Sequence, residues 1–144
     1  MLSHACGQPV ELMLALGAVV TGGVLSRFPR LRMAFLEGNC SWLPWWLWAL
    51  DARWEKWGDR ELYRQDMLPS ELFKRQCFIS VEPDEAFATH AVAELGDDNL
   101  VVSTDWPHDD SHYPHAIDTF MKLPLADATK RKALWENCAR LYKL

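Results

Sequence analysis

The hydrophobic pattern of the chain alternates between short apolar runs and longer amphipathic stretches. Three runs are almost wholly apolar and are bounded by turn-forming residues, which is typical of buried strands: residues 31–36, 77–81 and 100–103. Apolar side chains at helical spacing follow each run, and a further stretch of this kind precedes the first one. This order of elements predicts an α/β fold with parallel β/α units, because strands that alternate with helices rarely form hairpins.

Residues that start or stop helices mark the expected boundaries. Gly22 and Gly23 weaken the end of the first helix, and Pro29 stops it. Ser41 is placed to cap the next helix, and Pro44 suits a first helical turn. Gly96 and Pro124 terminate later helices. The expected helices cover residues 11–27, 42–57, 82–95, 113–121 and 126–142.

A stripe of tryptophans marks the second of these helices. Five tryptophans follow helical spacing together with Ala49 and Leu50: Trp42, Trp45, Trp46, Trp54 and Trp57. The stripe could pack a helix against a sheet, or it could form an aromatic wall for a ligand. We interpret most of it as packing, because a ligand needs one or two rings.

Each expected strand is followed by an acidic residue. Glu37, Glu82 and Asp105 stand directly after the three apolar runs or within two residues of them. The carboxyl ends of parallel strands meet on one face of a barrel or sheet, so we expect these carboxylates to converge there. Glu37 and Glu82 could act as acid/base groups or ligand contacts, or they could solvate strand ends and cap helices. Gly38 and Asn39 leave room for a ligand beside Glu37, whereas Pro83 and Asp84 look like a helix start.

Composition excludes several classes of protein. The 144 residues carry a formal net charge of −5, with 49% hydrophobic and 24% charged residues, so we expect a globular protein without a nucleic-acid partner. The four scattered cysteines form no CxxC motif, which argues against a cysteine zinc site and for a reducing, cytoplasmic location. The apolar stretch near the N-terminus is too short for a membrane span. The chain enters a helical pattern without an opening strand, as though its beginning were cut.

Four segments resemble the amidohydrolase-related family that includes aminocarboxymuconate-semialdehyde decarboxylase and resorcylate-type decarboxylases. They are GGVLSRFPRLRMAFLEGNCSWLPWWLWALD (22–51), QCFISVEPDE (76–85), GDDNLVVSTDWPH (96–108) and LWENCARLYKL (134–144). The resemblance covers nearly the whole chain in the right order. It implies that residues 1–144 form a single domain, the C-terminal part of a TIM-like (β/α) barrel, with the sixth, seventh and eighth strands of the parent barrel and flanking helices.

The resemblance also implies a metal site. The family binds a divalent metal, which we expect to be zinc, through histidines near the first and fifth strands and an aspartate at the eighth. Only the aspartate maps onto this chain, as Asp105 in STDWPH. His4 does not stand in a strand pattern and is not mapped. One aspartate is few ligands for a catalytic zinc, so the metal could be absent from this chain. The decarboxylase branch carries a histidine after its sixth strand, where this chain has Glu37.

The histidines and Asp105 each allow two interpretations. Asp105 is a metal ligand by resemblance, or it caps the loop after its strand. His108 could contact a substrate or orient a metal ligand, or it could order the turn around it. His112 and His115, three residues apart, could form a metal pair, but we favour a solvated helix end. Our expected site is therefore Asp105 as metal ligand, with Glu37 and His108 assisting in proton transfer or substrate placement.

Two functions fit these features. The first is a metal-dependent hydrolase or nonoxidative decarboxylase that acts on a small carboxylated or cyclic substrate. The second is a catalytically inactive barrel remnant that serves as an oligomeric structural or binding protein. A full barrel typically needs about 250 residues. We therefore expect a truncated piece of a longer enzyme, a homo-oligomer, or a complementing chain that supplies the remainder, and no membrane partner.

Overall fold

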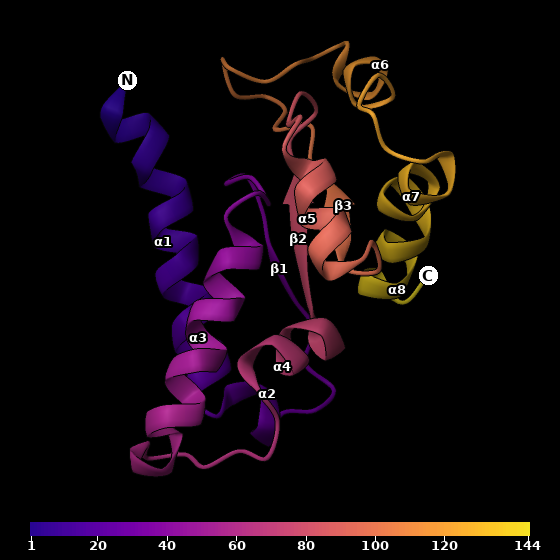
Figure 1. Ribbon diagram of the computed structural model, residues 1–144. Coiled ribbons are helices and arrows are strands. Elements are labelled where there is room, and N and C mark those ends of the chain that lie inside the picture. The colour runs from indigo at the N-terminus through magenta and orange to yellow at the C-terminus, as the bar shows by residue number, and fades with distance from the viewer.

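The computed structural model describes residues 1–144 apart from the side chain of His4. Three strands, β1 (Met33–Phe35), β2 (Cys77–Val81) and β3 (Leu100–Val102), form one parallel sheet in the order β1-β2-β3 (Figure 1). The predicted α/β class and all three strands are confirmed. β1 and β3 are shorter than the apolar runs that contain them.

The central strand, β2, holds the sheet together. Every one of its residues is buried, and Ile79 pairs with Phe35 on one side and Leu100 on the other. A strand that is buried on both faces has a nearly continuous apolar sequence, as the CFISV segment of β2 does. The parallel pairing also places the carboxyl ends of all three strands at the same edge of the sheet, the upper edge in Figure 1.

Helices surround the sheet, with α1 and α3 side by side on one flank and α7 and α8 beyond β3 (Figure 1). The helical elements are α1 (Leu2–Thr21), α2 (Val24–Arg27), α3 (Leu43–Trp57), the 3₁₀ turn η1 (Gly58–Arg60), α4 (Pro69–Gln76), α5 (Ala88–Leu95), α6 (Ala116–Phe120), α7 (Asp127–Arg131), the π-helical η2 (Lys132–Glu136) and α8 (Asn137–Tyr142).

Several helix boundaries differ from the sequence-based expectation. The first helix begins at Leu2, nine residues before the expected start, and it ends at Thr21 because Gly23 adopts a φ of 71° that no right-handed helix allows. The helix expected from Glu82 begins only at Ala88, and α4 was not predicted. Residues 127–142 are helical as expected, with one π-helical segment in the middle.

The tryptophan stripe on α3 only partly packs into the core. Trp42 and Trp46 are half-buried, and their indole N–H groups donate to the carbonyls of Gly38 and Met13 at 2.7 and 2.9 Å. Trp45 and Trp57 are 56% and 43% exposed, so the packing prediction is wrong for them. The inner face of α3 is instead formed by smaller side chains: Leu43, Leu47 and Ala49.

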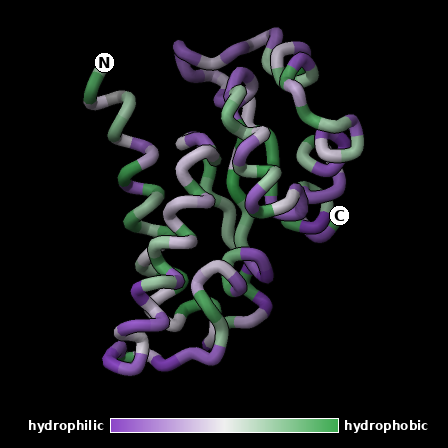
Figure 2. Tube along the Cα trace, in the orientation of Figure 1, coloured by the Kyte–Doolittle hydropathy of each residue, from purple (hydrophilic) through white to green (hydrophobic). Residues whose placement is uncertain are grey.

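The hydrophobic core lies between the sheet and the helices. The green tube in the centre of Figure 2 follows the strands, and purple segments lie in the outer loops. The largest fully buried side chains of the core include Phe73 of α4 and Phe120 at the end of α6. None of the helices formed by the described residues has the length and apolarity needed to cross a bilayer.

The loop before β3 is fastened by the last helix. The Asn137 amide is buried and donates to the carbonyls of Asp97 and Leu100 at 2.7 and 2.8 Å. Arg140 donates to the carbonyl of Asp98. Asn137 and Arg140 therefore tie the last helix to the loop before β3.

We predict that Asn137→Ala lowers the free energy of unfolding by about 1–3 kcal/mol, because two buried carbonyls lose their donor. Urea denaturation followed by circular dichroism measures this change. Glu94→Ala, an exposed substitution on α5, serves as the control and should change the value by less than about 0.5 kcal/mol. Equal stability of the two variants would show that the Asn137 bridge contributes nothing.

Candidate functional site

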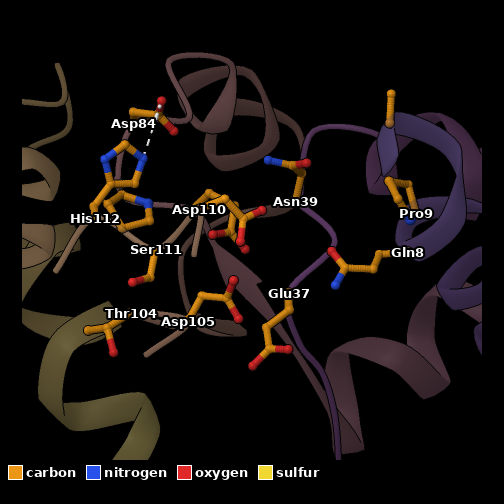
Figure 3. Close-up of a pocket in the computed structure, with 13 residues that line it drawn as sticks. Gln8, Pro9, Glu37, Asn39, Asp84, Thr104, Asp105, Asp110, Ser111 and His112 are labelled. Atoms are coloured by element: carbon orange, nitrogen blue, oxygen red, sulfur yellow. Dashed lines mark ion pairs between the residues drawn. The ribbon is translucent and has the colours of Figure 1, made fainter. Parts of the chain in front are cut away.

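The loops that follow the three strands enclose an acidic pocket of about 220 Å³. Glu37, Glu82 and Asp105 all line it, so the predicted convergence of the strand-end carboxylates is confirmed. Asp84 and Asp110 add two further acidic side chains (Figure 3). Gln8 and Pro9 of α1 form the opposite wall, which the sequence did not indicate.

Glu37 is positioned by contacts on both sides of its loop. Its backbone N–H donates to the Ser80 hydroxyl of β2 at 2.8 Å. The next residue, Gly38, passes so close to α1 that an added Cβ would lie 2.4 Å from Leu12 Cδ1, so a larger residue would require the Leu12 side chain to move. The strand neighbour and the helix together place the Glu37 side chain in the pocket.

Asp105 and His108 form a compact turn after β3. The His108 backbone N–H donates to the Asp105 carbonyl at 2.9 Å, and His108 Nδ1 lies 2.7 Å from Asp105 Oδ1. The hydrogen bond and charge of Asp105 raise the pKa of His108 above its usual value. The Asp105 side chain is 16% exposed and that of His108 is 59% exposed, so His108 reaches solvent while Asp105 is largely covered.

Glu37, Asp105 and His108 come together as a possible metal centre. One ligand atom from each lies within 4.8 Å of the other two. Two carboxylate oxygens and an imidazole nitrogen form a donor set that suits divalent ions such as zinc or manganese. The three site residues predicted from the sequence thus lie in one cluster and together offer three ligand atoms.

Glu82 has an unusual environment beside this cluster. Its Oε1 is buried and has no hydrogen-bond partner among the described residues. Burial, followed by the charges of Glu85, Asp105 and Glu37, raises the pKa of Glu82 to about 7. A carboxyl group in this position holds a proton near neutral pH, which is a property of proton-transfer groups.

His112 and His115 do not form a metal pair. His112 lines the pocket and lies 3.5 Å from Asp84 Oδ2, as the dashed line in Figure 3 shows. His115 lies 3.9 Å from Asp118 with 76% of its side chain exposed, which agrees with a solvated helix end. His90 is exposed on α5. The side chain of His4 lies outside the described residues.

Sequence reasoning missed Glu85, which carries the densest set of hydrogen bonds near the pocket. Glu85 directly follows Glu82-Pro83-Asp84 and lies inside the helix that the sequence predicts over residues 82–95. Ser41, expected as a helix cap, instead donates its hydroxyl to Glu85 at 2.5 Å, and α3 has no side-chain cap. The sequence shows three acidic residues around Pro83, namely Glu82, Asp84 and Glu85, and it does not indicate which of their side chains turns inward.

Three residues of the site have left-handed backbone conformations. Glu37, Asn39 and Asp105 have φ values of 65°, 61° and 55°. This region disfavours side chains with a Cβ, least of all Asn and Asp, and such residues are held there by the surrounding structure. They cluster here at the strand ends that line the pocket.

Parallel β/α units with acidic residues at the carboxyl ends of the strands define the class of α/β proteins whose ligand-binding edge lies at those strand ends. Within this class, the chain belongs to the amidohydrolase family, which it matches over residues 3–144. This match confirms the resemblance seen in the sequence.

Three curated proteins to which the chain is similar are gamma-resorcylate decarboxylases. The chain is 26% identical over 126 residues to gamma-resorcylate decarboxylase from Polaromonas sp. strain JS666, covering 85% of this chain and 37% of that protein. The chain thus spans less than two-fifths of the length of the curated relatives it matches.

Solved structures show the same fold. The 2,6-dihydroxybenzoate decarboxylase from Rhizobium is 25% identical, with a TM-score of 0.73 over 91% of this chain and 40% of that one. The dihydroxybenzoic acid decarboxylase from Polaromonas sp. JS666, solved with manganese and 2-nitroresorcinol, is 23% identical, with a TM-score of 0.73 over 92% of this chain and 40% of that one. The three-stranded sheet and its helices therefore match a part of these amidohydrolase barrels.

The raised pKa of Glu82 predicts a pH-dependent stability. The folded state binds the Glu82 proton more tightly than the unfolded state, so this contribution is full below about pH 4.5 and is lost as the pH rises through about 7. Allowing for its partial exposure, we expect a loss of about 1–2 kcal/mol across this window.

Urea denaturation of the native chain and of Glu82→Gln between pH 4.5 and 8, with a chelator present, measures this difference. The curve of Glu82→Gln should fall less steeply with pH, and that of Glu94→Gln should follow the native one. Parallel curves for all three would show that Glu82 ionises normally.

Proposed function

We propose that this chain carries part of the active site of a metal-dependent amidohydrolase-family enzyme, a nonoxidative decarboxylase or a hydrolase that acts on a small carboxylated or cyclic substrate. The observation that carries the proposal is the cluster of Glu37, Asp105 and His108, whose ligand atoms lie within 4.8 Å of one another. The curated relatives, all gamma-resorcylate decarboxylases, support the decarboxylase reading. The alternative of an inactive remnant has no observation in its favour.

We place the chain in its parent fold as the sequence suggested. In this proposal residues 1–144 form a single domain, and β1, β2 and β3 correspond to the sixth, seventh and eighth strands of a barrel. The shares of the solved structures that the chain covers, about 40%, are consistent with three of eight strands. Further strands would come from the rest of a longer enzyme of which this chain is a piece, from a second copy, or from a complementing chain.

Asp105 would hold the metal, with Glu37 and His108 completing the donor set. Two oxygens and one nitrogen suit manganese, which is bound in the Polaromonas enzyme, as well as the zinc expected from the sequence. When bound, a divalent ion acts as a Lewis acid that polarises a substrate oxygen. The Glu37 carboxylate, Asp105 and the neighbouring Glu82 otherwise bring like charges together, which a cation would offset.

Proton transfer is the second requirement of the reaction. Nonoxidative decarboxylation breaks a carbon–carboxylate bond, releases carbon dioxide and forms a carbon–hydrogen bond, so an acid must deliver one proton to that carbon. His108 can deliver this proton only in a state in which it does not bind the metal, and its hydrogen bond to Asp105 then raises its pKa above the usual value. Glu37, on the other side of the cluster, would hold the substrate or assist the transfer.

Manganese binding tests the metal site. We expect the native chain to bind Mn²⁺, measured by the loss of the free-ion electron paramagnetic resonance signal, and Asp105→Asn to bind it at least about 10-fold more weakly. Asp109→Asn, in the same loop but outside the pocket lining, should bind as the native chain does. Binding that survives Asp105→Asn unchanged, or that is absent from the native chain, would contradict the proposed site.

Stability of the Asp105→Ala variant tests whether this residue is functional or structural. Its side chain contacts only the half-exposed His108 turn in the described hydrogen-bond network, so we expect less than about 1 kcal/mol change in the free energy of unfolding without metal. Thermal denaturation in the presence of a chelator measures this change. A loss of several kcal/mol would assign Asp105 a structural role.

A further inference from the structure

We propose that Glu85 is a positioning residue, whose buried carboxylate fastens the loop after β1 to the loop after β2 and thereby sets Glu37 opposite Asp105. The consequence for metal binding rests on the proposed function, whereas the fastening of the loop does not.

The Glu85 carboxylate accepts hydrogen bonds from both loops. Oε1 accepts from the backbone N–H of Cys40 at 2.9 Å, from that of Ser41 at 2.8 Å and from the Ser41 hydroxyl at 2.5 Å. Oε2 accepts from the N–H of Cys40 at 3.1 Å and from that of Glu82 at 3.2 Å. One side chain thus satisfies four donor groups that belong to two separate loops.

Burial makes these bonds difficult to replace. Glu85 is 8% exposed and Cys40 is fully buried, so water has little access to the donors if the carboxylate is removed. Burial, and then the Glu85 charge, raise the pKa of the Cys40 thiol, so a neutral thiol lies beside the carboxylate. Hydrogen bonds to a carboxylate are shorter and stronger than those between neutral groups, which agrees with the 2.5 Å contact to Ser41.

The fastened loop is the one that carries Glu37. β2 contacts this loop at its start, where the Glu37 N–H donates to Ser80, and the turn after β2 contacts it at its end, where Glu85 holds Cys40 and Ser41. Glu85 is itself fixed, because its N–H donates to the Glu82 carbonyl at 3.1 Å and its own carbonyl accepts from Ala88 at the start of α5.

This two-point attachment explains how Glu37 keeps a left-handed backbone in a loop of only seven residues between β1 and α3. Without Glu85, the N–H groups of Cys40 and Ser41 would have to find other acceptors, and the loop would relax. The Glu37 carboxylate would then leave the cluster while Asp105 and His108, which lie in the loop after β3, would stay in place.

Amide hydrogen exchange and Mn²⁺ binding, measured on the same variants of the purified chain, test this role. In Glu85→Gln, we expect the amides of residues 38–42 to exchange about 10-fold faster or more, and Mn²⁺ to bind several-fold more weakly. Ser41→Ala removes a single donor and should show the same effects to a smaller degree. Glu94→Gln makes the same change of charge on the exposed face of α5 and should show neither effect.

Amides of the last helix, residues 134–142, serve as the internal reference for global opening. Faster exchange confined to residues 38–42, with weaker Mn²⁺ binding, would support the proposal. Unchanged exchange in this loop would overturn it, and so would faster exchange with unaltered Mn²⁺ affinity. If the native chain binds no Mn²⁺, the proposed metal function fails, while local acceleration in Glu85→Gln would still support the fastening of the loop.

Discussion

The parallel pairing of β1 and β3 with the buried strand β2 is the constraint on which the other features depend. It brings three chain segments that are more than 60 residues apart at their extremes to one edge of a sheet, and it does so through backbone hydrogen bonds that any buried sequence would form. The side chains that follow the strands therefore lie close together at this edge. A functional cluster in this fold requires only the correct residues at the strand ends, because the pairing supplies their proximity.

The cost of this arrangement is electrostatic. Five acidic side chains line one pocket of about 220 Å³, and their like charges repel one another. Three responses are visible in the structure. Asp105 pairs with His108, the pKa of Glu82 is raised to about 7, and Glu85, which is not part of the pocket lining, accepts hydrogen bonds from backbone N–H groups. A bound cation would be a fourth response, and it would act on the same residues.

The sequence was informative where the physical signal is local. The apolar run CFISV predicts the bounds of β2 to the residue. The acidic residues that follow the three apolar runs, Glu37, Glu82 and Asp105, were identified without knowledge of the fold. It was less informative where the outcome depends on distant contacts. The start of α1, the late start of α5 and the exposure of Trp45 follow from which neighbours are available, and helical spacing does not encode this. Glu85 escaped notice for the same reason, because its partners lie 44 and 45 positions away.

The left-handed backbone at Glu37, Asn39 and Asp105 has a consequence for the evolution of this fold. Glycine would relieve unfavourable local geometry at each of these positions, and the gain would be roughly 1 kcal/mol per site. A population selected only for thermal tolerance should therefore accumulate glycine there and lose its carboxylates. Retention of acidic side chains at positions 37 and 105 in descendants of this chain would indicate that selection for their function outweighs the gain in stability from glycine.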